Sequence, residues 1–140
     1  MIVLDTNIIS ELVKSSPDRG VISWLQRQEP LHLYLNAIVV MEQAFGAERF
    51  YLRNGSDRYI RMLDGALANQ FEGRVLAFDG NAPVLTGRLR ARRESIGRPI
   101  AVQDAMIAAI CLSHGATLAT RNTKDFEGLD LKVVNPFEGG

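Results

Sequence analysis

The sequence predicts an α/β domain in which helices cover a mainly parallel sheet. Short buried strands alternate with helical segments along the whole chain, and no linker, repeat or low-complexity segment interrupts them. Alternation of this kind is typical of layered α/β domains whose strands run parallel. The 140 residues fit one domain over residues 1–140, which is long enough to bury a core.

The first half of the chain is expected to contain two strands and four helices. The strands are short apolar runs, and the helices carry apolar residues every three or four positions. The strands are expected at residues 2–4 and 31–35. The helices are expected at residues 6–14, after Pro17, at residues 37–50 with Asn36 as N-cap, and from Ser56 or Asp57 through Phe71.

The second half is expected to contain three strands and two helices. The strands are placed at residues 75–79, 117–121 and 131–135. An arginine-rich helix is expected over residues 82–96, followed by a helix over residues 101–113 that is apolar nearly all round. An all-apolar helix is a buried helix, and Gly115 is positioned to end it.

Composition excludes several classes of protein. Hydrophobic residues make up 46% and charged residues 23% of the chain, as in a globular protein. Cys111 is the single cysteine, so neither a disulfide framework nor a cysteine zinc site is available. No apolar run approaches the ~18 residues needed to span a bilayer, and no leader is evident. We expect a cytoplasmic protein without membrane contact.

The formal net charge is zero, so no global field attracts the chain to nucleic acid. The basic residues are nevertheless mostly arginine, and five of them lie in the segment RLRARRESIGR at residues 88–98. Arginine binds phosphate with a planar, bidentate fork. This segment therefore fits both a local anion-binding strip and an ordinary solvated helix face.

An acid follows the first expected strand directly, in the opening segment MIVLDTNIISEL. Ligands of parallel sheets bind beyond the carboxyl ends of the strands, where Asp5 would lie. Aspartate is also a preferred N-cap, and a helix is expected to start immediately behind Asp5. The residue alone fits a helix cap and a reaction centre equally well.

Two further acids lie in helices that are otherwise apolar. Glu42 has Ile38 and Phe45 as its neighbours on the same helix face, and Gly46 follows one turn later at a cost of ~1 kcal/mol relative to alanine. Asp104 lies in the first turn of the most apolar helix. The helix dipole favours an acid there, but an unpaired carboxylate near a core is unfavourable.

A fourth candidate lies in the segment TLATRNTKDF, which follows another expected strand. Asn122 and Asp125 both fall at this position, and both are also ordinary turn residues. The sequence does not decide between them.

Three acids at one edge of a sheet would repel one another unless a positive group lies among them. No histidine or cysteine accompanies them at metal-ligand spacing, which argues against zinc. Oxygen ligands of this kind suit Mg²⁺, with Mn²⁺ as an alternative. A carboxylate-bound Mg²⁺ is a common device for cleaving phosphate esters.

The chain resembles the PIN-domain family in four segments: MIVLDTNIISEL, the helix around Glu42, QDAMIAA around Asp104, and ATRNTKDF. It is most similar to the VapC-type toxins of type II toxin–antitoxin pairs, in particular their FitB-like branch, which ends in a comparable NPF segment. The resemblance implies a three-layer α/β/α sandwich with a central, mainly parallel five-stranded sheet. It also implies Mg²⁺-dependent endonucleolytic cleavage of RNA.

The resemblance implies metal-binding and catalytic roles for Asp5, Glu42 and Asp104. The fourth acid of the family corresponds to Asn122, which is an amide in this sequence, and Asp125 is the nearest carboxylate. We therefore carry Asn122 as a candidate catalytic residue and Asp125 as a candidate metal ligand. Because an amide contributes no charge, the number of metal ions stays open.

Other polar residues are expected to support these acids. Thr6, Asn7 and Thr120 would hydrogen-bond the carboxylates. The expected contacts to the RNA backbone come from arginines, namely Arg88, Arg92, Arg93 and Arg121.

The resemblance also implies partners. It predicts a homodimer and a cognate VapB- or FitA-like antitoxin, whose tail wraps the toxin and places an arginine in the acidic pocket. A larger hetero-oligomer would form with the antitoxin, which alone would contact DNA.

Two other functions remain as alternatives. A non-catalytic protein could use the pocket only to bind RNA or an antitoxin within a DNA-bound regulatory complex. A phosphohydrolase of the haloacid dehalogenase type would need a second acid at position 7, where the chain has Asn7, and a lysine near the later acids, for which Lys124 is the nearest candidate.

Overall fold

The computed structural model describes residues 1–140 and contains one five-stranded sheet in the order β3-β2-β1-β4-β5. All four strand pairings are parallel, so the expected parallel sheet is confirmed. Ile2 pairs with Leu33 on one side and with Thr117 on the other, which places β1 at the centre. The strands are β1 (Ile2–Leu4), β2 (Leu33–Asn36), β3 (Val75–Leu76), β4 (Thr117–Ala119) and β5 (Val133–Val134).

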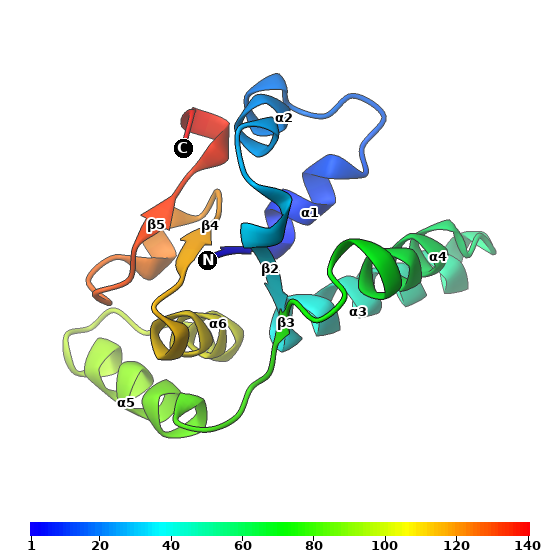
Figure 1. Cartoon of the computed structure of the whole chain (residues 1–140). Coiled ribbons are helices and arrows are strands. Elements are labelled where there is room, and N and C mark those ends of the chain that lie inside the picture. The colour runs from blue at the N-terminus through cyan, green and yellow to red at the C-terminus, as the bar shows by residue number, and fades with distance from the viewer.

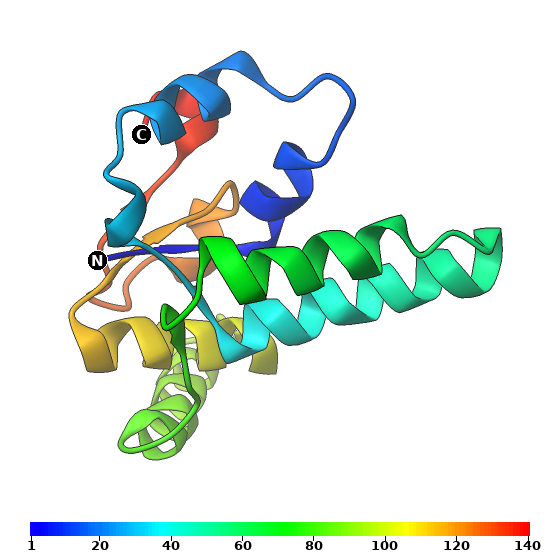
Figure 2. The same cartoon turned by 45° about the vertical axis from the view of Figure 1, so that its right-hand side comes forward.

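Helices cover both faces of the sheet (Figures 1 and 2). The α-helices are α1 (Thr6–Leu12), α2 (Arg19–Gln26), α3 (Ala37–Asn54), α4 (Arg58–Gly65), α5 (Ala82–Ser95) and α6 (Val102–His114). In Figure 2 the helices α5 and α6 lie on one side of the strands, and α1 and α2 on the other. The helices α3 and α4 form an antiparallel pair that projects beyond the sheet. The result is the expected α/β/α arrangement.

Helix α6 packs against strand β4 on one face of the sheet. Its residues from Ala105 through Cys111 are nearly all buried, as the uniformly apolar sequence predicts. Burial raises the pKa of the Cys111 thiol to about 12, so this cysteine is a packed and unreactive core residue. Gly115 ends the helix with a φ of 63°, the left-handed conformation that glycine adopts without strain.

Several expected elements differ in their bounds. The strand predicted at residues 75–79 is only Val75–Leu76, and the strand predicted at residues 131–135 is only Val133–Val134. Both lie at the edges of the sheet, where one side has no strand to pair with. Pro30–His32 forms a 3-10 turn in place of the start of β2, because Pro30 favours a turn. None of the helices has both the length and the apolar character needed to cross a bilayer.

A buried helix cap, Asn36, lies at the junction of strand β2 and helix α3. Asn36 ends β2 and caps α3, and its Oδ1 accepts the N–H groups of Ile38 and Val39 at 3.1 and 3.0 Å. Asn36 is fully buried, and its Nδ2 has no hydrogen-bond partner. The cap therefore fixes the start of the helix that carries Glu42, at the cost of one unpaired amide group.

We predict that Asn36→Ala lowers the free energy of unfolding by about 1–2 kcal/mol, because two buried N–H groups lose their acceptor. Asn36→Ser keeps an oxygen acceptor and removes the unpaired amide, so its loss should be smaller. Urea unfolding monitored by circular dichroism measures both changes. Equal losses in the two variants would show that the capping oxygen is not the cause.

Candidate acidic site

The carboxyl ends of the central strands border a cavity of about 450 Å³. Three of the acids singled out in the sequence line it together: Asp5, Glu42 and Asp104. They come from the end of β1, from α3 and from the first turn of α6. Residues separated by about 100 positions in the chain therefore converge, as the parallel-sheet argument predicts.

Asp5 is both a helix cap and a cavity residue. Its Oδ1 accepts the N–H of Thr6 at 2.8 Å, which caps α1. Its Oδ2 accepts the hydroxyl of Thr120 at 2.7 Å and the amide of Asn7 at 3.4 Å. Burial nevertheless raises the pKa of Asp5 above its ordinary value, although these hydrogen bonds act in the opposite direction. The carboxylate is held rigidly in a place that disfavours its charge.

The expected supporting hydrogen bonds to the acids are present in the structure. Thr6 Oγ1 donates to Glu42 Oε1 at 2.8 Å, which joins the first turn of α1 to α3. The Asn7 side chain also donates to Thr120 Oγ1 at 3.1 Å and accepts the N–H of Arg121 at 3.0 Å. Thr6, Asn7 and Thr120 thus connect Asp5 and Glu42 into one network, to which Asp104 does not belong.

Asp104 is the acid whose charge is least compensated. It lies half-buried in the first turn of α6, and no side chain in the structure donates a hydrogen bond or forms an ion pair with it. Burial raises its pKa to about 6, and the negative charges of Asp5, Asp125 and Glu42 add to the effect. This repulsion shows that the carboxylates lie close enough to influence one another.

The two candidates for the fourth position differ in their relation to the cavity. Asn122 lines the cavity, and its main-chain N–H donates to Thr120 Oγ1 at 3.1 Å. Asp125 is exposed and is not a lining residue, but its charge raises the pKa of both Asp5 and Asp104. The amide therefore borders the cavity itself, whereas the carboxylate acts on the acids of the cavity through its charge.

Sequence reasoning missed a fourth acid that lines the cavity. Glu11 is buried one turn after Asn7 on α1. The hydrogen bond from Lys14 at 2.9 Å and the N–H of Asp18 at 2.8 Å hold the pKa of its carboxyl below the ordinary value. Its spacing of four residues from Asn7 was the available signal. The charge of Glu11 is already balanced by Lys14. Because the Glu11 carboxylate also accepts the N–H of Asp18, it stabilises the connection between α1 and α2.

The predicted RNA-contact arginines divide into three kinds. Arg88 and Arg92 are exposed on α5 and do not line the cavity. Arg121 does line it, and its guanidinium lies 4.5 Å from the centre of the Phe137 ring. Arg93 is different: it is buried, and its Nε and Nη1 donate to main-chain carbonyls. It is therefore far less accessible to RNA than the other three arginines.

The donor set of the cavity fits a hydrated hard cation. No three acidic, histidine or cysteine side chains are close enough to ligate one metal ion directly. The cavity is lined by carboxylate, amide and hydroxyl oxygens, however, and its acids repel one another. Mg²⁺ retains several of its waters when carboxylates bind it. The arrangement therefore fits a cation that some of the acids hold through water.

The fold and the cavity together define a class of protein. It comprises α/β/α domains in which carboxylates from three elements gather beyond the carboxyl ends of a parallel sheet. Comparison with known proteins identifies the family. The PIN domain family matches residues 2–131, and this chain belongs to it.

Relatives match over nearly the whole chain. The VapC ribonuclease Y4jK of Sinorhizobium fredii is 41% identical over 138 residues, which cover 99% of both chains. Toxin FitB of Neisseria gonorrhoeae is 35% identical and covers 98% of this chain and 99% of its own. The tRNA(fMet)-specific endonuclease VapC of Shigella flexneri is 30% identical over 125 residues, 89% of each chain.

A solved structure shows the same fold. The structure of FitAB bound to an IR36 DNA fragment contains a chain that superposes with a TM-score of 0.88 at 34% identity. The match covers 98% of this chain and 96% of that one. The resemblance to VapC- and FitB-type toxins that the sequence indicated is thereby confirmed.

We predict that Asp104→Asn stabilises the metal-free protein at neutral pH. The raised pKa of about 6 means that the native state gains a proton relative to the unfolded state and loses stability as the pH rises from about 4 to 6. The full effect corresponds to about 3 kcal/mol, and solvent screening reduces it to about 1–2 kcal/mol.

Thermal unfolding in chelator measures this difference. The melting temperature of Asp104→Asn should exceed that of the wild type at pH 7, and the two should converge near pH 4. Asp64 is an exposed acid on α4, so Asp64→Asn is the matched control, and its melting temperature should equal that of the wild type. A stabilisation independent of pH would contradict the electrostatic explanation.

Proposed function

We propose that this protein is a metal-dependent endoribonuclease that acts in the cytoplasm as the toxin of a toxin–antitoxin pair. The observation that carries the proposal is the convergence of Asp5, Glu42 and Asp104 on one cavity in which their charges repel. The names of the relatives, a VapC ribonuclease and a tRNA(fMet)-specific endonuclease, support RNA as the substrate.

The proposed roles follow from the positions of the residues. Asp5, Glu42 and Asp104 would hold Mg²⁺ or Mn²⁺, at least one of them through water, with Asn122 and Asp125 as additional oxygen donors. The chemistry that such a cation supplies is the acidification of a water and the stabilisation of charge on the scissile phosphate.

The supporting residues keep these acids in place. Thr120 and the N–H of Thr6 restrict Asp5 to one orientation, and the Thr6 hydroxyl does the same for Glu42. The RNA backbone would be bound by Arg121 at the cavity and by Arg88 and Arg92 on α5, which are exposed.

A second cavity, of about 560 Å³, supports an antitoxin as the partner. It lies between α1, α3 and α4, and most of its lining residues are hydrophobic. Thr6, Ser10 and Glu42 line both cavities, so the apolar groove opens toward the acids. An apolar segment in the groove could thus place a following arginine beside Glu42, where it would replace the cation.

The assembly is also part of the proposal. The solved structures of FitAB bound to an IR36 DNA fragment and of DNA-bound VapBC from Salmonella typhimurium support a complex that binds DNA through its antitoxin. A homodimer is proposed as the toxin's own unit. Met41 and Phe45, which are 50% and 63% exposed on α3, provide apolar surface for such a contact.

The two alternatives make different predictions. A non-catalytic binding protein would bind RNA without a divalent cation and leave it intact. For the haloacid dehalogenase alternative, the structure places Asn7 as a donor to Asp5, where that chemistry needs a second acid. This geometry favours the nuclease.

We predict that purified protein cleaves RNA in Mg²⁺ or Mn²⁺ and that excess chelator abolishes cleavage. Asp5→Asn and Glu42→Gln should each reduce the rate at least ~100-fold, because each removes a ligand of the cation. Glu48→Gln, an exposed acid on the same helix as Glu42, is the control and should retain full activity. Gel analysis of RNA termini measures the products, and wild-type activity in Asp5→Asn would refute the proposal.

We predict that Gly46→Leu blocks the antitoxin without harming the nuclease. Gly46 lines the apolar groove, and a Cβ at this position would meet no atom within 4 Å. The variant should fold at least as well as the wild type, because glycine is unfavourable within a helix. Its leucine side chain would occupy space needed by the antitoxin segment.

The test is co-expression with the reading frame directly upstream, followed by co-purification. We expect Gly46→Leu to lose at least ~10-fold in antitoxin affinity and to escape inhibition. Ala44→Leu, exposed on α3 outside the groove, should bind normally. Normal inhibition of Gly46→Leu would place the antitoxin elsewhere.

A further inference from the structure

Arg93 has a position unlike that of the arginines around it. Arg88, Arg90 and Arg92 are exposed on the same helix, whereas Arg93 is 6% exposed and is the only basic side chain buried in the protein. A buried cation is unfavourable unless it is fully hydrogen-bonded. Its location therefore calls for a specific set of acceptors.

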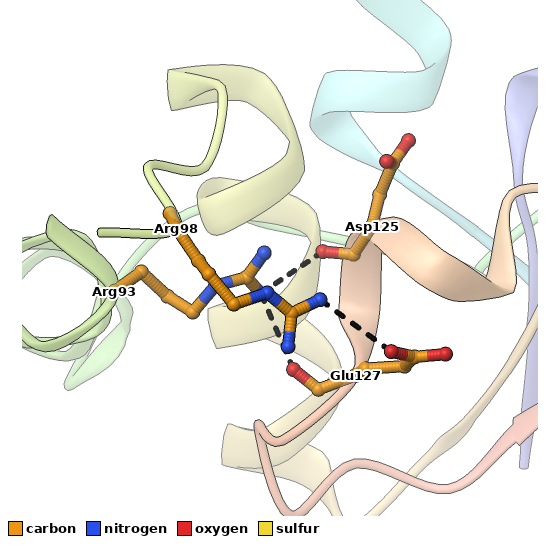
Figure 3. A network of polar contacts seen from close by, with 4 residues as sticks. All are labelled: Arg93, Arg98, Asp125 and Glu127. Atoms are coloured by element: carbon orange, nitrogen blue, oxygen red, sulfur yellow. Dashed lines mark hydrogen bonds and ion pairs between the residues drawn. The ribbon is translucent and has the colours of Figure 1, made fainter. Parts of the chain in front are cut away.

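Those acceptors are three main-chain carbonyls, and Figure 3 draws the two that belong to Asp125 and Glu127. Arg93 Nε donates to the carbonyl of Arg98 at 2.8 Å. Arg93 Nη1 donates to the carbonyl of Asp125 at 3.1 Å and to that of Glu127 at 3.3 Å. No carboxylate forms an ion pair with Arg93, and Glu127 pairs with Arg98. The guanidinium thus binds backbone.

The backbone that it binds carries a residue of the acidic site. Asp125 lies in the short 3-10 turn Thr123–Phe126 and Glu127 is its C-cap residue, and the last carbonyls of a helical turn need donor partners from outside the turn. Between them, the side chain of Phe126 is anchored in the core at 2% exposure. At the other end of the turn, the N–H of Asn122 is held by Thr120.

With its backbone held on this side, Asp125 points its carboxylate the other way. Figure 3 shows this carboxylate directed away from both arginines. The negative charge of Asp125 raises the pKa of Asp5 and of Asp104, so the carboxylate lies within electrostatic range of the cavity. Its side chain is exposed and accepts no hydrogen bond, so only the backbone fixes its position.

We propose that Arg93 is a positioning residue: by binding the carbonyls of Asp125 and Glu127 it holds the β4–β5 loop so that the Asp125 carboxylate stays within electrostatic range of the acidic cavity. The effect on metal binding rests on the proposed nuclease function. The effect on the loop itself does not, so the two can be tested separately.

The test is a double-mutant cycle between Arg93→Met and Asp125→Asn, read by Mn²⁺ binding in electron paramagnetic resonance. Arg93→Met should raise the dissociation constant for Mn²⁺ about tenfold, in the range of residues that orient metal ligands. In the Asp125→Asn background the same change should have no further effect. A general loss of structure would instead weaken binding equally in both backgrounds, and that result would overturn the proposal.

Arg90→Met is the matched control, because Arg90 is an exposed arginine on the same helix with no proposed contact to RNA, and it should bind Mn²⁺ as the wild type does. Arg93→Lys retains the charge and some of the hydrogen bonds. It should show an intermediate loss, and it replaces Arg93→Met if that variant does not fold.

Amide hydrogen exchange in the presence of chelator measures how firmly residues 122–127 are held when no metal is bound. In the Arg93 variants, residues 122–127 should exchange at least ~10-fold faster while the amides of β1 and β4 remain unchanged. Unchanged exchange in residues 122–127 would overturn the positioning role even if the protein is a nuclease. If the wild type neither binds Mn²⁺ nor cleaves RNA, the proposed function fails, and the exchange result alone decides the role of Arg93.

Discussion

The acidic site depends on the hydrogen bond from Thr120 to Asp5, which closes a loop of 115 residues at 2.7 Å. It joins the carboxyl ends of β1 and β4, the two strands that lie side by side at the centre of the sheet. Thr120 is fully buried, and its oxygen also accepts the side-chain amide of Asn7 and the N–H of Asn122. One hydroxyl group thus fixes three parts of the site relative to one another.

The fold concentrates negative charge where it is unfavourable for stability. Asp5 and Asp104 both have raised pKa values because they are desolvated and lie near other acids. Glu11, in contrast, lines the same cavity but is paired with the ammonium group of Lys14, and the pKa of its carboxyl is lowered. A site in which some acids are compensated and others are not is typical of functional residues rather than of packing.

The sequence predicted the sheet and the converging acids because both follow from local patterns. Apolar runs locate β1 and β4, and the rule for parallel sheets places Asp5 beside later acids. It could not predict Arg93, since nothing in RLRARRESIGR distinguishes this arginine from Arg92. Only the packing of α5 against the β4–β5 loop buries one and exposes the other. The lengths of the two edge strands were overestimated for a similar reason, because these lengths depend on pairing with a neighbouring strand.

Glu42 lines both the acidic cavity and the apolar groove, so binding in one of them affects binding in the other. A molecule that reaches Glu42 from the groove and one that uses it from the acidic side therefore compete for the same carboxylate. Under the proposed function these competitors are the antitoxin and the divalent cation, so a rising cation concentration would weaken the binding of the antitoxin.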